Sequence, residues 1–145
     1  MKNKHLPSPG LKRVYDSDKH YYLSEKYHLK FYSDHLDKEV EFHIPKHFIV
    51  DGASIPRFFW RLVSHPLNPR YWVAFVVHDY LYGNSMLNIW EQNLSRHDVD
   101  ELFYEMLRAE GVGWTVANTM HKAVRSGGWT SFRKNNNKFA TKDQL

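Results

Sequence analysis

One apolar run constrains the fold of this chain more than any other feature. Residues 71–82, YWVAFVVHDYLY, form an almost uninterrupted apolar segment, and Gly83 and Asn84 follow it directly. A helix at the surface of a protein carries one apolar face, whereas a helix that is apolar all round lies inside a core. The sequence therefore predicts a central helix with the rest of the domain packed around it.

The polar residues of this central helix are the next constraint. His78 and Asp79 stand where the pattern demands apolar side chains, and burying a charge is costly unless a partner or a metal compensates. Tyr82 returns to the face of His78, while Asp79 points about 100° away around the helix. One turn thus presents an imidazole, a carboxylate and a phenol, and we expect other parts of the fold to supply their partners.

Two further helices are predicted after the central one. The second begins at Ser95, with Asp98 at the spacing of a capping box, and ends at Gly111. The third spans residues 112 to 126 and ends at Gly127-Gly128. Apolar residues at helical spacing give each helix a core face, namely Val99, Leu102, Phe103, Met106, Val116, Met120, Ala123 and Val124. Trp114, near the start of the third helix, is also predicted to lie in the core.

A carboxylate on the second helix is a candidate partner for His78. Asp100 borders the apolar stripe and lies on the same line as Arg96. If the two helices pack antiparallel, Asp100 reaches the second ring nitrogen of His78, fixes the imidazole tautomer and stabilises the cation formed when the ring takes a proton from water. Arg125 on the third helix is a candidate partner for Asp79 or Asp100, and that pairing would make the cluster a structural ion network.

The first half of the chain has the patterns of short strands. Segments 27–32 and 39–44 alternate polar and apolar residues, as half-buried antiparallel strands do. Further strands are predicted over residues 11–16, 20–23 and 47–50, with a short helix over residues 56–63. The predicted fold is α+β, a small antiparallel N-terminal sheet packed against a C-terminal bundle of three helices. Residues 1–132 form one domain in this prediction, and residues 133–145 a polar, basic, disordered tail.

Size, charge and composition limit the classes of function. A chain of 145 residues fits one domain. Its net charge is +4, but residues 1–10 carry +2 and residues 133–145 carry +3, which leaves −1 for residues 11–132. Dedicated nucleic-acid binding is therefore not expected.

The absence of cysteine excludes disulfides, a thiolate nucleophile and cysteine zinc sites. No apolar run approaches the roughly 18 residues of a transmembrane helix, and residues 1–10 lack a signal sequence, so we expect a cytosolic protein.

Four blocks of sequence in a fixed order resemble a known family. They are Asp51-Gly-Ala-Ser-Ile-Pro56, His78-Asp-Tyr-Leu-Tyr82, Ser95-Arg96 followed by Asp100, Phe103 and Met106, and Ala123-Val-Arg125. In these blocks the chain resembles short proteins encoded mostly in tailed bacteriophages and their prophages, described as a domain of unknown function. The resemblance implies a phage origin, with the protein in the host cytoplasm or in the virion.

The His-Asp-x-x-Tyr pattern of residues 78–82 is also similar to the secreted and viral phospholipase A-two superfamily. This resemblance implies that His78 is the general base for a water, that Asp100 and Tyr82 orient it, and that Asp79 binds calcium, which polarises the ester carbonyl. That superfamily completes its calcium site with a glycine-rich loop, and here only the segment Asp51-Gly-Ala-Ser54 stands in that order. Asp51 is therefore the second candidate metal ligand, and a tight turn is the alternative role for it.

Three functions remain open from the sequence. The first is a small hydrolase acting on an ester or related bond at a membrane or cell envelope. The second is a metal-dependent phosphohydrolase, because the adjacent residues His78-Asp79 are similar to the His-Asp pair with which such enzymes hold a divalent ion. The metal ligands would then be His47 or His65, the pair His78-Asp79, and Asp100. The third is a non-catalytic virion or host-interaction protein in which the His-Asp network is structural.

The strand half contains further histidines without a spacing typical of metal ligands. They are predicted to be surface residues, namely His20, His28, His35 and His43.

Overall fold

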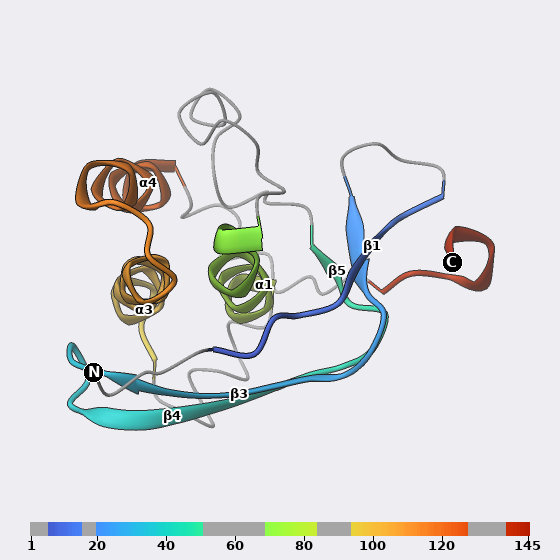
Figure 1. Cartoon of the computed structure of the whole chain (residues 1–145), viewed down its shortest axis with the longest axis horizontal. Coiled ribbons are helices and arrows are strands. Elements are labelled where there is room, and N and C mark those ends of the chain that lie inside the picture. Colours follow the sequence, from blue (N-terminus) through green and yellow to red (C-terminus); the bar gives the residue numbers. More distant parts are fainter. Residues whose placement is uncertain (1–5, 16–19, 51–68, 84–93, 128–138) are drawn as a thin grey trace.

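The computed structural model describes residues 6–15, 20–50, 69–83, 94–127 and 139–145. Within these residues the N-terminal part forms small antiparallel sheets and the C-terminal part forms three α-helices, so the α+β prediction is confirmed (Figure 1). The short helix predicted over residues 56–63 lies outside the described residues.

The strands form two separate sheets where the sequence predicts one. Strands β1 (Leu11–Arg13), β2 (Tyr21–Leu23) and β5 (Ile49–Val50) form a three-stranded antiparallel sheet in the order β1-β2-β5. Among the described residues, strands β3 (Tyr27–Ser33) and β4 (Lys38–Ile44) pair only with each other, as an antiparallel hairpin. In the turn between them Asp37 has φ of 51°, a conformation that a short polar side chain tolerates.

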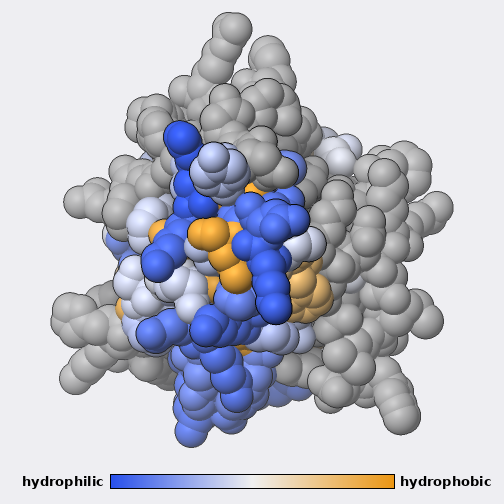
Figure 2. All heavy atoms as spheres, turned by 90° about the vertical axis from the view of Figure 1, so that its right-hand side faces the viewer, coloured by the Kyte–Doolittle hydropathy of each residue, from blue (hydrophilic) through white to orange (hydrophobic). Residues whose placement is uncertain are grey.

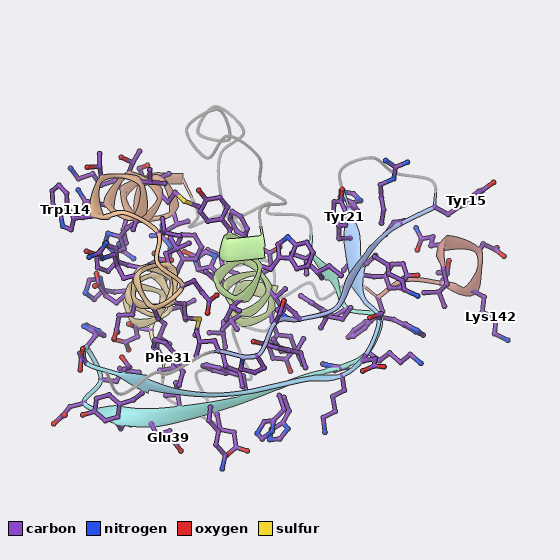
Figure 3. The ribbon with its side chains drawn as sticks, viewed as in Figure 1. Tyr15, Tyr21, Phe31, Glu39, Trp114 and Lys142 are labelled. Carbon is purple, nitrogen blue, oxygen red and sulfur yellow. The ribbon has the colours of Figure 1, made fainter. Side chains whose placement is uncertain are left out.

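The β3–β4 hairpin separates an inner and an outer face, as the alternating pattern predicts. The inner side chains are buried, and the outer ones are mostly exposed. Figure 3 shows Phe31 pointing toward the helices and Glu39 pointing away from them. The inner face is formed by Tyr27, Leu29, Phe31, Val40, Phe42 and Ile44.

Helix α3 (Arg96–Ala109) lies between α1 (Pro69–Gly83) and α4 (Trp114–Gly127), and α1 packs against the strands. Helix α1 contacts α3 as well as β4 and β5, and α3 also contacts α4. Figure 1 shows α1 and α3 side by side above the hairpin, with α4 above α3, on the side of α3 that faces away from the hairpin. Helix α1 is buried as its apolar sequence predicts, with Val73, Ala74, Val76, Val77 and Leu81 at most 1% exposed.

The predicted ends of α3 are confirmed. The Ser95 side chain accepts a hydrogen bond from the Asp98 backbone N–H at 3.1 Å, and the Asp98 carboxylate accepts one from the Ser95 backbone N–H at 2.9 Å. This is the complete capping box. At the other end Gly111 adopts φ of 86°, which a residue without a Cβ reaches freely.

Two expectations about the third helix and the tail differ from the structure. Trp114, an aromatic residue that we expect in the core, begins α4 and is 60% exposed. Residues 139–145 lie in the segment for which the sequence predicts disorder, but Phe139 bridges to Phe48 and the Ala140 N–H donates to the His47 carbonyl at 2.8 Å. Phe139 also makes an edge contact with the ring of Phe48, so an apolar contact holds this end of the chain against the strands.

The surface around β1 and the C-terminal turn is mainly hydrophilic. Figure 2 shows this side of the molecule, where small hydrophobic areas lie among hydrophilic side chains in the described part. The turn is the 3₁₀-helix η2 (Lys142–Gln144). No helix among the described residues is long and apolar enough to cross a membrane.

Candidate functional site

Five polar side chains from three helices meet at the centre of the helical part. Helix α1 contributes His78 and Tyr82, α3 contributes Arg96 and Asp100, and α4 contributes Arg125. On α1 and on α3 the two side chains are one helical turn apart and so share a face. We call these five residues the buried cluster.

Asp100 is the centre of the buried cluster. Its Oδ1 lies 2.8 Å from His78 Nε2 and accepts a hydrogen bond from the Tyr82 hydroxyl at 2.5 Å. Its Oδ2 accepts a hydrogen bond from Arg125 Nη1 at 2.8 Å. The expectation that the second helix brings Asp100 to His78 is confirmed, and so is Arg125 as a partner of Asp100.

Arg96 connects the cluster to the end of α4. Its Nε donates to the Tyr82 oxygen at 3.1 Å, and its Nη2 donates to the carbonyl oxygens of Val124 and Arg125 at 2.7 Å each. Carbonyls in the last turn of a helix have no partner within that helix. Arg96 supplies that partner from α3, so the cluster joins α1, α3 and α4.

Burial fixes the protonation of the central pair. The side chains of His78 and Asp100 are both 0% exposed. Burial lowers the pKa of His78 below its ordinary value, because a charged ring would lose its hydration. Burial alone raises the pKa of Asp100, but the hydrogen bonds from His78, Tyr82 and Arg125 outweigh that effect and leave the pKa lowered.

These pKa directions determine the roles in each hydrogen bond. Asp100 is a carboxylate and only accepts, so His78 Nε2 carries the proton of the neutral ring and donates it to Oδ1. Burial raises the pKa of the Tyr82 hydroxyl, which therefore remains a donor. A neutral His78 protonated at Nε2 has its lone pair on Nδ1, the ring nitrogen that does not bond Asp100.

The metal ligands that the resemblance implies stay predictions. Asp79 follows His78 on α1 and is half-buried, and no group of three potential metal ligands within the described residues contains it. Asp51 lies outside the described residues, as does His65. The other arrangement, with His47, the pair His78-Asp79 and Asp100 as metal ligands, is not among the ligand groups of the described residues.

Sequence reasoning missed a second polar group on the outer face of the hairpin. The surface positions predicted for His28 and His43 are confirmed, but the sequence does not predict that both contact Glu41, at 2.6 Å and 3.0 Å. We call these three residues the outer cluster. The register of the hairpin was the missing signal, because residues 28 and 43 are opposite each other only when the turn is centred between residues 33 and 38.

Comparisons with known proteins identify a family without a described activity. Residues 28–124 match the family described as "Protein of unknown function (DUF1353)". The chain is 36% identical over 89 residues to "Uncharacterized protein y4jT" of Sinorhizobium fredii (strain NBRC 101917 / NGR234), a match that covers 60% of this chain and 24% of that protein. The chain therefore spans about a quarter of the length of this relative. No solved structure matches the chain.

Proposed function

For this chain, which belongs to the family described as protein of unknown function (DUF1353), we propose the function of a non-catalytic interaction protein. In this protein the buried cluster holds three helices in one arrangement. In this proposal the cluster performs no reaction. Its role is to fix the surface that the helices and the hairpin present to a partner.

The enclosure of His78 and Asp100 carries this proposal. A general base needs a position about 3 Å away for water or substrate, whereas both side chains of this pair are 0% exposed. Both oxygens of Asp100 already accept hydrogen bonds from within the cluster. Hydrogen bonds to both carboxylate oxygens from side chains of the two other helices support a structural role.

Charge balance supports the same role. Asp100 is fully buried but its two cationic neighbours are not, since Arg96 and Arg125 have side chains that are 20% and 35% exposed. The network thus neutralises the buried charge while the guanidinium groups keep part of their hydration. Such a network favours one packing of the helices, because any other arrangement leaves a buried carboxylate without donors.

The partner that we propose is a protein of a phage particle or of the infected host. The phage setting rests on the four sequence blocks described above. Trp114 at the start of α4 is 60% exposed, and tryptophan is among the residues that most often anchor protein interfaces. The similarity to one part of a longer relative agrees with a module that works beside other domains.

One experiment tests the interaction and a second tests the absence of catalysis. The tagged chain, expressed in an infected host, should co-purify with phage particles or a host protein, and Trp114→Ala should reduce that recovery. Tyr15→Ala is the matched control, because Tyr15 is also exposed, at 84%, but lies on the opposite side near β1. Recovery of the chain without any partner, or recovery independent of Trp114, would contradict the interaction.

The enzymatic arm uses phospholipid vesicles and soluble esters in the presence of millimolar calcium. The proposal expects no turnover by the wild-type protein. Turnover that disappears in a folded His78→Gln variant would refute it.

A hydrolase is the second candidate function, and one observation favours it. The bonds of Asp100 to His78 Nε2 and to the Tyr82 hydroxyl have the orientation that the phospholipase A-two resemblance implies, and the lone pair of His78 is on Nδ1. The substrate class would be an ester at a membrane or envelope surface, with calcium held by Asp79 and Asp51. In this case calcium raises the melting temperature of the wild-type protein but not of Asp79→Asn, and a missing shift argues against the metal-assisted reaction.

A further inference from the structure

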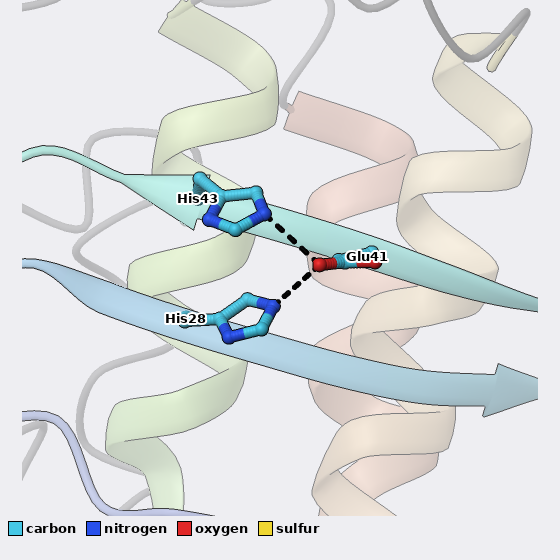
Figure 4. A group of neighbouring side chains, drawn as sticks. All are labelled: His28, Glu41 and His43. Atoms are coloured by element: carbon cyan, nitrogen blue, oxygen red, sulfur yellow. Dashed lines mark hydrogen bonds and ion pairs between the residues drawn. The ribbon is translucent and has the colours of Figure 1, made fainter.

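We propose that the outer cluster is a binding site for a transition-metal dication of the Zn²⁺ class, with His28, Glu41 and His43 as its three protein ligands. This site is separate from the buried cluster and does not depend on the function proposed above. It lies on the face of the β3–β4 hairpin that points away from the helices (Figure 4).

The hairpin register brings the two imidazoles together. His28 and His43 are directly opposite each other in the antiparallel pair, and their rings are stacked with centroids 4.2 Å apart and planes 9° apart. Glu41 is two residues before His43 on β4, and side chains two apart on a strand share one face. The backbone therefore places all three side chains on one small area of the outer face.

The ligand atoms converge on one point. His28 Nε2 lies 2.6 Å and His43 Nε2 lies 3.0 Å from the same atom, Glu41 Oε1, as Figure 4 shows. The three atoms lie within 4.8 Å of one another. Among the described residues this is the one group of three metal-binding side chains with this property.

Rotation of three exposed side chains converts this hydrogen-bonded group into a coordination site. The carboxylate withdraws, and the two near-parallel rings tilt so that both Nε2 lone pairs point at the ion. Bonds of about 2.0–2.1 Å in a tetrahedral arrangement require ligand atoms about 3.3 Å apart. The present separations from Glu41 Oε1 are 2.6 Å and 3.0 Å, so the carboxylate needs to withdraw by less than about 1 Å. The Glu41 side chain is 45% exposed, which leaves room for that rotation.

The donor set selects the class of metal. Two imidazole nitrogens and one carboxylate oxygen suit Zn²⁺, Co²⁺, Ni²⁺ and Cu²⁺, whereas Ca²⁺ and Mg²⁺ prefer sites built from oxygen. The exposed side chains leave the remaining coordination positions to water, as in zinc sites with three protein ligands. A bound ion would also link β3 to β4.

Lys30 is a charged neighbour of Glu41 that opposes the metal. It is directly opposite Glu41 in the hairpin register, on the same outer face. Its positive charge attracts the carboxylate and repels a dication. Removal of that charge should therefore strengthen metal binding, whereas removal of a ligand should weaken it.

The test is calorimetric titration of the untagged, full-length protein with Zn²⁺, repeated with Co²⁺ to record its visible spectrum. We expect one strong site per chain, a rise in melting temperature on binding, and Co²⁺ bands typical of mixed nitrogen and oxygen ligands. His28→Gln, His43→Gln and Glu41→Gln should each weaken the affinity by roughly tenfold or more, while Lys30→Gln should increase it.

His97→Gln is the matched control. Its side chain is 55% exposed and lies 4.0 Å from the single carboxylate of Glu101, so its loss should leave the affinity unchanged. The proposal is overturned by an absence of saturable Zn²⁺ binding at millimolar concentration. It is equally overturned if His97→Gln weakens binding as much as His28→Gln does, because the metal would then be distributed over the surface histidines. The five substituted residues are all exposed, so circular dichroism is expected to show that the five variants are folded. In the wild-type protein the imidazole NMR signals of His28 and His43 should shift together on titration with Zn²⁺.

Discussion

The molecule contains two groups of histidine and carboxylate side chains that differ mainly in their exposure. In the buried cluster His78 Nε2 lies 2.8 Å from Asp100, and both side chains are 0% exposed. In the outer cluster His28 Nε2 lies 2.6 Å from Glu41, and the side chains are 46% and 45% exposed. The hydrogen bonds are similar in length, so the surroundings determine what each group does.

The comparison shows how exposure separates a structural role from a binding role. Inside the helices the protein must supply every partner of the carboxylate, and it does so with His78, Tyr82 and Arg125. On the hairpin, water can replace any partner that leaves. The buried group is therefore hard to open, whereas the outer group can exchange a hydrogen bond for a metal ion at little cost.

The largest expected effect comes from removing the centre of the buried cluster. Asp100→Ala should lower the free energy of unfolding by about 3–5 kcal/mol, because it leaves Arg125, His78 and Tyr82 without their shared acceptor. Urea denaturation followed by circular dichroism measures this loss. A loss below about 1 kcal/mol would remove the energetic distinction between the two clusters.

Acid conditions give the next effect, through His78. Burial lowers the pKa of His78 in the folded protein below 6.5, so the unfolded chain takes up a proton that the folded protein does not. Stability is therefore full above pH 6.5 and falls by about 1.4 kcal/mol per pH unit as the pH drops from there toward the folded-state pKa. The lowered pKa of Asp100 extends the loss below its ordinary value of 3.8.

A series of urea titrations between pH 5 and pH 8 tests this prediction, with His78→Gln as the control. The variant should have a flatter dependence than the wild-type protein between about pH 5 and pH 6.5. Identical slopes for the two proteins would mean that the folded state protonates His78 as readily as the unfolded chain does.

A single hydroxyl of the buried cluster gives a smaller effect. Tyr82→Phe removes the donor to Asp100 and the acceptor of Arg96 but keeps the aromatic packing. We expect a loss of about 1–2 kcal/mol by urea denaturation. An unchanged or increased stability would indicate that the other donors compensate fully for the lost hydroxyl.

The smallest effect is expected at the neighbouring residue of α3. Glu101 also pairs with a histidine at 2.8 Å, His121, but its side chain is 24% exposed. Glu101→Ala should therefore cost less than about 1 kcal/mol, which makes it a matched control for Asp100→Ala one residue away. Similar losses for both variants would show that exposure does not govern these pairs.

Local patterns in the sequence predict much of the helical part and of the buried cluster. The apolar run of residues 71–82 locates α1, and Ser95 with Asp98 locates the start of α3, because helix periodicity and capping depend on residues close in the chain. The pairing of His78 with Asp100 follows from the same periodicity once α1 and α3 pack together. The contacts of Arg96 with the carbonyls of α4 depend on how two helices cross and were not predicted.

The sequence by itself determined which helices form, which faces are apolar and that His78 needs a buried partner, since each of these follows from short-range periodicity and the cost of burying polar groups. Only the tertiary structure decided the division of the strands into two sheets, the exposure of Trp114 and the meeting of His28 with His43. Sheet order and helix crossing depend on contacts between residues far apart in the chain. The pairing of His28 with His43 depends on where the hairpin turn is centred, which the alternating pattern leaves open.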